Sequence, residues 1–353
     1  MNVLDLFSGC GGISSGFKLA GFNISGGVDI DPDSIRTFQK NFPKSKAICE
    51  DLLEYTDEKI LNDFSGENID VIVGGPPCQG FSSANRWQKE NEDPRNKLFF
   101  EYLRFVDLLK PKAVVIENVR GILTRDKGFA KKRIEKLLKD LGYRVECKVL
   151  NASDYGVPQN RLRAFFVAIR NDYNTTFDFN NLIIKPKVTV EEAIGELYDL
   201  DNNTKDVLSS KPNNDYTKYL RKENQKIFNH EIKYPAQVTQ ERISHVPQGG
   251  NWRNIPVELF PNNRNNRHSS AFKRLDGKAC SVTIDTGNAH SNYFHPLYNR
   301  IPTVREAARI QSFRDNFVLE GSRTSQYRQI GNAVPPLLAK AVADELLKYI
   351  IKK

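Results

Sequence analysis

Glycine and carboxylate residues lie where the first strands of this 353-residue chain are expected to end. A glycine-rich turn at residues 5–12 follows the first expected strand, and Asp29 follows the second, about 20 positions after the glycines. Small residues let a backbone approach a ligand closely, and a carboxylate at this spacing can accept both hydroxyl groups of a ribose. Together these features favour a cofactor that contains adenosine. Taken singly, they are also explained by a plain tight turn and a helix-capping aspartate.

A cysteine and a glutamate follow two further expected strands. Cys78 stands in the turn Gly75-Pro76-Pro77-Cys78, where two prolines fix the backbone. A cysteine held in such a loop at the start of a helix can have thiolate character, although a buried structural cysteine is the commoner case. Glu117 ends a later apolar strand, so a nucleophile and a proton-handling carboxylate are expected at one crevice. An ion-paired structural glutamate is the alternative for Glu117.

Short apolar runs alternate with helical patterns over the first 170 residues. This alternation is typical of βαβ units and predicts an α/β fold with a Rossmann-like, doubly wound, mostly parallel sheet. Strands are expected at 2–7, 22–28, 70–73, 113–116, 144–150 and 164–169, and helices at 13–20, 33–41, 98–109 and 127–141.

A second, smaller domain is expected where this alternation ends. From about residue 172 to 300 the periodicity is weak and Asn pairs and prolines are frequent, which indicates a loop-rich domain built on short strands. Helical spacing returns at 335–351, where the helix is expected to pack on the sheet. We therefore expect a catalytic and cofactor-binding domain of residues 1–171 plus 328–353, and a second domain of residues 172–327.

Composition excludes several classes of protein. The chain has 52 Lys and Arg against 43 Asp and Glu, a net charge of +9, and 39% hydrophobic residues, which is unlike a disordered chain. No apolar run approaches the roughly 18 residues of a membrane span, and no secretory signal is seen at the N-terminus. The five cysteines are odd in number and lack the spacing of metal ligands, so we expect no metal site and a reducing, cytoplasmic location.

Positive charge is concentrated in one part of the chain. Residues 221–280 hold eleven basic and five acidic side chains. Such a segment indicates a surface that faces a polyanion, with a solvated basic face as the equally weighted alternative.

Six motifs, in order, resemble the motif set of DNA (cytosine-5) methyltransferases. They are DLFSGCGG at 5–12, GPPCQGFS at 75–82, ENV at 117–119, QNRLR at 159–163, TVREAARIQ at 303–311 and QIGNAVPP at 329–336. They span nearly the whole chain outside residues 172–300. The resemblance implies the fold of S-adenosylmethionine-dependent methyltransferases and a prokaryotic enzyme, either part of a restriction-modification system or acting alone.

The resemblance implies catalytic roles for four residues. Cys78, as a thiolate, would add to C6 of a flipped-out cytosine, and Glu117 would hold or protonate N3 of the base. Arg161 and Arg163 would orient the glutamate and the base, or hold phosphate; for one of the two, a phosphate contact alone is the simpler role.

S-adenosyl-L-methionine is the cofactor that the resemblance implies, with no metal. The residues implied to bind it are Asp5, Phe7, Ser8, Gly9, Gly11, Gly12, Asp29, Ile30, Asp51, Leu52, Pro76, Leu98, Asn332 and Ala333. Asp29 stands where the family usually has glutamate, and its arm toward the ribose is shorter.

Double-stranded DNA is the implied substrate, because the variable region at 172–300 coincides with the basic segment. Residues 245–253 and 262–268 combine glycine, aromatic and arginine residues suited to base-edge and phosphate contacts, and surface loops are the alternative.

We also expect a monomer, no membrane association, and a restriction endonuclease acting on the same site as a partner. Two other functions stay open: methylation of a tRNA cytosine, and a catalytically silent, methyltransferase-like DNA-binding protein. A nicotinamide dehydrogenase would explain neither the Pro-Pro-Cys turn nor the motif at Asn332.

Overall fold

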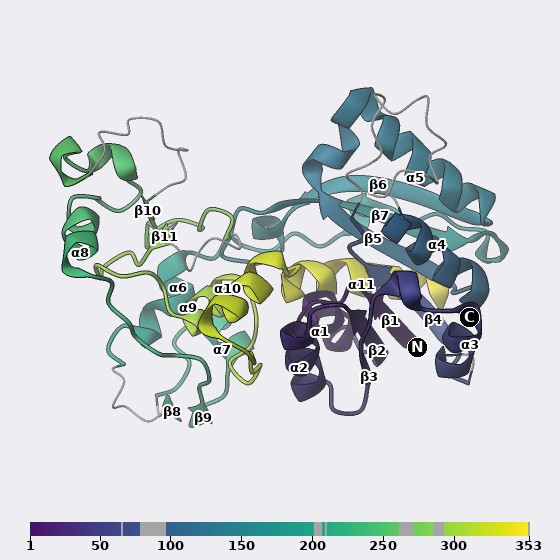
Figure 1. Ribbon diagram of the computed structural model, residues 1–353, viewed down its shortest axis with the longest axis horizontal. Helices are drawn as coiled ribbons and strands as arrows, with labels where there is room; N and C mark the ends of the chain where they lie inside the picture. Colours follow the sequence, from purple (N-terminus) through teal and green to yellow (C-terminus); the bar gives the residue numbers. More distant parts are fainter. Residues whose placement is uncertain are drawn as a thin grey trace. The chain divides into compact units, whose positions relative to one another are not determined.

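The computed structural model describes residues 1–64, 66–77, 97–200, 207–208, 210–260, 272–284 and 293–351. The chain divides into two compact units, shown in Figure 1. The first comprises Met1–Ala152, Leu162–Ile184 and Val334–Lys353, and the second comprises Ser153–Arg161 and Lys185–Ala333. None of the helices in the described ranges is long and apolar enough to cross a membrane.

A seven-stranded sheet forms the centre of the first unit, in the order β3-β2-β1-β4-β5-β7-β6. Its strands are β1 (Asn2–Leu6), β2 (Asn23–Asp29), β3 (Lys46–Cys49), β4 (Ile69–Gly74), β5 (Ala113–Val119), β6 (Tyr143–Asn151) and β7 (Leu162–Arg170). Strands β1 to β5 pair in parallel, whereas β7 runs antiparallel to both of its neighbours. The predicted doubly wound, mostly parallel sheet is therefore confirmed.

The order in which strands are added to the sheet reverses at β1, because β2 and β3 lie on one side of it and β4 and β5 on the other. In open α/β sheets ligands bind outside the carboxyl ends of the strands at this reversal point. The carboxyl ends of β1, β2, β4 and β5 share one edge of the sheet because these strands are parallel. Since β7 is antiparallel, its first residues lie at that same edge, and Arg163 pairs in register with Val119.

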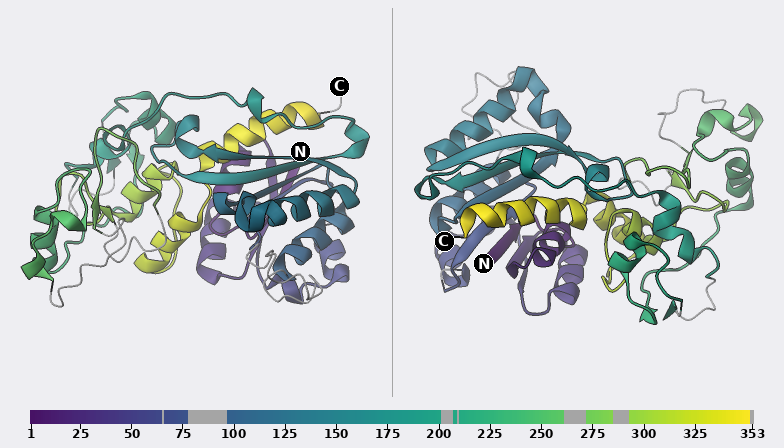
Figure 2. Two further views of the ribbon diagram at one scale, coloured as in Figure 1. Left: turned by 90° about the horizontal axis from the view of Figure 1, so that it is seen from above. Right: turned by 180° about the vertical axis from the view of Figure 1, so that it is seen from behind.

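Helices cover both faces of this sheet. They are α1 (Gly12–Leu19), α2 (Pro32–Asn41), α3 (Asp57–Phe64), α4 (Lys97–Leu109), α5 (Phe129–Asp140) and α11 (Pro336–Ile350). Figure 2 shows α4 and α11 on opposite sides of the strands. Because both faces are covered, β4 is buried at all six positions and reads as a continuous apolar run rather than an alternating one.

Helix α11 returns the C-terminal part of the chain to the first unit. Its buried positions include Leu338, Val342, Leu346 and Ile350, which recur at helical spacing. The helix lies directly against α1, where the backbone at Gly16 comes so close that a Cβ there would stand 2.5 Å from Cβ of Ala339. The predicted C-terminal helix is therefore confirmed.

The second unit consists mainly of short helices and connecting segments. Its α-helices are α6 (Val190–Ile194), α7 (Asp215–Leu220), α8 (Gln237–Ser244), α9 (Val304–Ile310) and α10 (Arg323–Asn332). The expected short strands are two-residue pairs: β8 (Val207–Leu208) with β9 (Gln225–Lys226), and β10 (Lys273–Arg274) with β11 (Tyr293–Phe294). Several of the segments expected to be loops are helical instead, because capping residues such as Thr189 and Asn214 start helices too short to show a periodic pattern.

Buried ion pairs hold helix α9 in the second unit. The Arg300 guanidinium donates to both carboxylate oxygens of Glu306, at 2.7 and 2.8 Å, and Arg309 pairs in the same way with Asp315. All four side chains are almost completely buried. Burying charges is unfavourable unless they are paired, so these contacts tie α9 firmly to the segments on either side of it.

Candidate active site

The turn between β1 and α1 has a left-handed backbone at several positions. Phe7, Gly9 and Gly11 all have positive φ angles, at 59°, 52° and 92°. At Gly11 a Cβ would stand 2.6 Å from the ring of Phe42, so only glycine fits between this turn and α2. The chain therefore turns tightly from the end of β1 into the first turn of α1, as the glycine pattern predicts.

Asp5 is buried beneath this turn. One of its carboxylate oxygens accepts hydrogen bonds from the Ser14 hydroxyl at 2.6 Å and from the Ser14 amide at 3.3 Å. Burial raises the pKa of Asp5 to about 7, although the bonds from Ser14 act in the opposite direction. The second carboxylate oxygen, Oδ1, is buried without a hydrogen-bond partner.

Asp29 lies at the end of β2 and holds the glycine turn in place. Its Oδ2 accepts the amide of Gly9 at 2.8 Å, and its Oδ1 accepts the amide of Asp31 at 2.9 Å. Burial raises the pKa of Asp29 above its usual range, while these two amides lower it. Two carboxylate oxygens have about four lone-pair positions, so acceptor capacity remains after these bonds. Ile30, the next residue, exposes 66% of its surface, which is unusual for a large apolar side chain.

The other predicted cofactor residues in the first unit lie around the same strand ends. Asp51 caps a short 3₁₀ helix (Leu52–Glu54), with its carboxylate accepting the amide of Leu53 at 3.0 Å. Leu52 is buried in the main apolar core, and Leu98, near the start of α4, is half-buried. Pro76 is buried just beyond β4.

Glu117 and Arg163 form an ion pair at the edge where β5 ends and β7 begins. Arg163 Nε lies 2.8 Å from Glu117 Oε1, and the glutamate side chain is only 12% exposed. The loop after β4 passes close by, since a Cβ at Gly75 would stand 3.2 Å from Glu117 Oε2. Glu117 is the fifth residue of β5 rather than a residue beyond a strand that ends at 116, because pairing with β7 extends the strand to Val119.

Asn118 has a role that the sequence reasoning missed. Its side-chain amide donates to the carbonyl oxygen of Pro76 at 2.9 Å, and its Oδ1 accepts the amide of Val119 at 3.0 Å. These bonds tie the end of β5 to the loop that leads toward Cys78. The signal was present, because Asn118 stands between Glu117 and Val119 in a recognised motif. Cys78 itself, at the start of residues 78–96, lies outside the described residues.

The two motif arginines have different partners. Whereas Arg163 contacts Glu117, the Arg161 guanidinium belongs to the second unit and donates to the carbonyl oxygens of Ile284, at 3.0 Å, and Gly331, at 2.8 Å. Arg161 is 1% exposed. Asn332 is the exposed last residue of α10, and Ala333 follows it as the final residue of the second unit.

Part of the predicted DNA-facing region of the second unit can be described. His245 and Arg253 are exposed, whereas Trp252 is half-buried against a small apolar cluster formed by Val246, Ile255 and Phe260. Residues 262–268 fall within 261–271, outside the described residues. The Trp252 ring therefore has a packing role, and the exposed polar residues beside it carry the surface charge.

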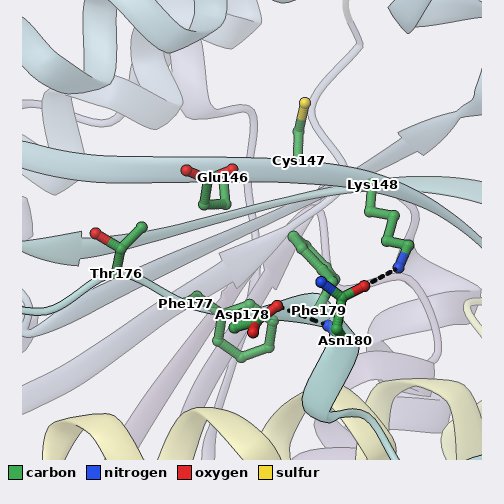
Figure 3. A pocket seen from close by; sticks show the side chains of 8 residues that line it. All are labelled: Glu146, Cys147, Lys148, Thr176, Phe177, Asp178, Phe179 and Asn180. Carbon is green, nitrogen blue, oxygen red and sulfur yellow. Dashed lines mark hydrogen bonds between the residues drawn. The ribbon is translucent and has the colours of Figure 1, made fainter.

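Two further features lie away from these strand ends. A cavity of about 450 Å³ is lined by residues 146–148 of the edge strand β6 and by residues 176–180 (Figure 3), and none of the predicted site residues takes part in it. Among the residues that the structure describes, no group of three or more His, Cys, Asp or Glu side chains is arranged to hold a metal ion.

The fold and the strand-end residues define an α/β protein with a glycine turn and a half-buried carboxylate, Asp29, where the strand order of its sheet reverses, and with the Glu117–Arg163 ion pair at the end of β5. Comparison with known families gives the finer assignment. The model of the C-5 cytosine-specific DNA methylase family matches residues 1–348, so the chain belongs to this family and is a DNA cytosine-5 methyltransferase. The resemblance predicted from six motifs is thereby confirmed.

Curated relatives match over almost the whole chain. The type II methyltransferase M1.HphI of Haemophilus parahaemolyticus is 38% identical, and the match covers 99% of this chain and 87% of that protein. The type II methyltransferase M.DdeI of Desulfomicrobium norvegicum is 37% identical, with 99% and 89% covered. Both of these relatives are type II methyltransferases.

Solved structures share the fold. A prophage-encoded chain from E. coli, assigned as a DNA modification methyltransferase, is 29% identical and superposes with a TM-score of 0.78, with 99% of each chain covered. A DNMT2 mutant from Spodoptera frugiperda has a TM-score of 0.62 at 19% identity, with 99% of each chain covered. The second likeness concerns the fold alone.

Proposed function

We propose that this chain transfers a methyl group from S-adenosylmethionine to C5 of a flipped-out cytosine in a specific sequence of double-stranded DNA. The observation that carries the proposal is the Glu117–Arg163 ion pair, which stands beside Gly75 at the start of the turn that contains Cys78. A carboxylate held in place by an arginine can hold or protonate a ring nitrogen while a cysteine thiolate adds to the ring.

Cys78 acts as the nucleophile in this proposal. Cytosine C5 is a poor nucleophile, and addition of the Cys78 thiolate to C6 makes C5 electron-rich. Glu117 holds or protonates N3, so that the negative charge pushed into the ring is stabilised, and Arg163 keeps the glutamate oriented. Once C5 has accepted the methyl group, loss of the C5 proton to water or another base breaks the bond between C6 and Cys78, and the thiolate leaves the methylated base.

The residues at the strand ends fit the proposed cofactor. Asp29 retains acceptor capacity for ribose hydroxyl groups, and exposed Ile30 offers an apolar surface for an adenine ring. Asp5 Oδ1, which is buried without a hydrogen-bond partner, can accept a hydrogen bond from the cofactor. When bound, S-adenosylmethionine supplies an electrophilic methyl group on its sulfonium. Phe7, Gly9, Gly11 and the other residues named from the motifs, including Asn332 and Ala333, are proposed to complete its binding.

Residues 172–327 are proposed to recognise DNA. A base inside a duplex is inaccessible to Cys78, so the target must be swung out of the stack while the protein grips the strands around it. The basic segment at 221–280 fits such a role, since phosphate contacts dominate affinity for DNA. By analogy with the type II relatives, a restriction endonuclease that cuts the same sequence is the proposed cellular counterpart.

Methyl transfer to defined nucleic acids tests the proposal. Purified protein is incubated with S-adenosylmethionine carrying a labelled methyl group and with either plasmid DNA or total tRNA, and bisulfite sequencing then locates the modified bases. We expect label in DNA, at one cytosine of one short sequence. Label in tRNA alone would favour the RNA alternative, and no label in either, with DNA still bound, would favour a silent DNA-binding protein.

A further inference from the structure

Three buried polar side chains in the second unit form a connected group. Gln159, Arg161 and Gln311 are each 0–1% exposed, and they come from segments about 150 residues apart in the chain. Buried amide and guanidinium groups are unfavourable unless their hydrogen bonds are satisfied, so the partners of these three side chains show what the group holds together.

The two glutamine side chains bind each other, and Gln159 also binds the backbone of Ile284. Gln159 Nε2 donates to Gln311 Oε1, and Gln159 Oε1 accepts the amide of Ile284 at 3.0 Å. Arg161 donates to the carbonyl oxygen of the same Ile284 at 3.0 Å. Gln159 and Arg161 therefore hold both backbone polar groups of one residue.

The other ends of this group converge on the last turn of α10. Gln311 Nε2 donates to the carbonyl oxygens of Ile330, at 3.0 Å, and Ala333, at 2.6 Å, and Arg161 donates to that of Gly331 at 2.8 Å. Carbonyl groups at a helix C-terminus lack partners within the helix and carry its partial negative charge. Donors from Gln311 and Arg161 thus fix the backbone on both sides of Asn332.

We infer that Gln311 and Arg161 are positioning residues that set the backbone at Asn332 and Ala333 for the cofactor. The inference rests on the proposed function, in which Asn332 and Ala333 bind S-adenosylmethionine. It also separates the two motif arginines: Arg161 acts through the end of α10, whereas Arg163 acts on Glu117. Gln159, Arg161 and Gln311 are called the brace below. Because the side chain of Asn332 is exposed at the helix end, the position of Asn332 depends on its backbone, which the brace holds through the neighbouring carbonyl groups.

Cofactor affinity measured apart from catalysis tests this inference. The variant Gln311→Met keeps a side chain of similar length but removes both donors to α10. We expect its dissociation constant for S-adenosylhomocysteine, measured by titration calorimetry, to rise about tenfold or more, since small displacements of binding groups are costly. KM for S-adenosylmethionine should rise in parallel, with kcat at saturating cofactor changed much less. Arg161→Met should follow the same pattern, whereas loss of Arg163 should lower kcat.

Tyr327→Phe is the matched control. Tyr327 lies on α10, is 1% exposed and donates to the carbonyl oxygen of Pro302 at 2.5 Å, away from the end of the helix. Its variant should lower the melting temperature yet leave the dissociation constant unchanged. Gln311→Glu, which keeps the acceptor for Gln159 but not the donors to α10, serves as a second variant if Gln311→Met does not fold.

Each outcome decides the question. Unchanged affinity in a folded Gln311 variant, or an equal loss in Tyr327→Phe, would overturn the inference while leaving the proposed function intact. If neither Gln311 variant folds, the brace holds the unit together rather than placing Asn332, and the inference is also wrong. If the wild-type protein fails to bind S-adenosylhomocysteine, the cofactor assignment falls and the inference falls with it.

Discussion

Glu117 and Arg163 are partners whose side chains are only 12% and 16% exposed, so each depends on the other for its charge to be compensated. Removing one partner of such a pair leaves a charge that is poorly solvated. At the scale of single residues, the proposed chemistry therefore predicts that these two side chains act as a unit rather than independently.

A double-mutant cycle tests that prediction. We expect Glu117→Gln to lower the rate constant of methyl transfer by about 10²- to 10⁴-fold, the usual contribution of a positioned proton-handling group. Arg163→Met should lower it as well, and the double variant should lose little more than the worse single variant. Arg170→Met, at the other end of β7 with an exposed partner in Asp172, is the control and should retain activity. Additive losses would show that Arg163 does not act through Glu117.

Asp5 makes stability depend on pH. Its pKa is about 7 in the folded protein against 3.8 when unfolded, so the folded state binds the proton more tightly. Between about pH 4 and 7 the unfolded state is deprotonated first, and the free energy of unfolding falls as pH rises, by up to the order of 4 kcal/mol. Asp5→Asn removes this titration. Urea unfolding of the cofactor-free protein at pH 5 and pH 8 should show a smaller fall for the variant; parallel pH dependences would contradict the assignment.

At the scale of elements, the packing of α1 on α11 fixes the start of the glycine turn and the C-terminal segment together. At Gly16 a Cβ would stand 2.5 Å from the backbone oxygen of Pro336 as well as from Ala339, and backbone cannot move aside cheaply. We expect Gly16→Val to reduce the free energy of unfolding by about 1–3 kcal/mol or more, as measured by urea denaturation. Gly66→Ala, where the added methyl group meets open space, should change it by less than about 0.5 kcal/mol. Equal effects would mean that the two helices are not held at this distance.

The elements that the sequence predicts well are those with long apolar runs. β4 and α4 appear within a residue or two of their expected limits, because burial on both faces or on one stripe leaves a clear pattern. β3 and α3 were not predicted: β3 is a four-residue edge strand with no fully buried position, so its sequence carries little periodicity. Local sequence patterns therefore predict an element that is strongly buried. They do not predict an edge strand such as β3, which is defined by its backbone pairing with β2.

The candidate site shows the same division. The residues at strand ends, Asp29 and Glu117, follow from strand prediction and residue type. The partners of Arg161 do not, since Ile284 and Gly331 are 123 and 170 positions away along the chain. From residue type alone, the Arg161 guanidinium could contact a phosphate or a glutamate. Only the folded chain shows that it donates to backbone carbonyl groups.

At the scale of the whole molecule, the buried ion pairs determine where a specificity exchange can be made. Arg300 pairs with Glu306, and Arg309 contacts Glu196, so an exchange of residues 172–300 alone would replace one partner in each pair. An exchange of residues 185–333 keeps both pairs within the transferred segment. Residues 153–161 of the second unit lie outside this segment. They contact it through the side chain of Gln159, which bonds to Gln311, and through the Arg161 guanidinium, which donates to backbone carbonyl groups.

We therefore predict that exchanging residues 185–333 for those of a relative gives a folded enzyme that methylates the relative's sequence with the same cofactor. The shorter exchange should give a protein with a lower melting temperature. Bisulfite sequencing of DNA from cells that express each chimera measures the sequence methylated. Retention of the original sequence by the longer chimera would show that recognition lies elsewhere in the chain.

The most direct measurement concerns the covalent step at Cys78. DNA that carries 5-fluorocytosine at the target position is incubated with the protein and S-adenosylmethionine, then analysed under denaturing conditions. Fluorine cannot leave as a cation, so the final elimination is blocked, and the account predicts a protein–DNA complex that survives denaturant for wild type and is absent for Cys78→Ala. A complex that forms equally with Cys78→Ala, or no complex with a wild-type protein that methylates ordinary DNA, would contradict it.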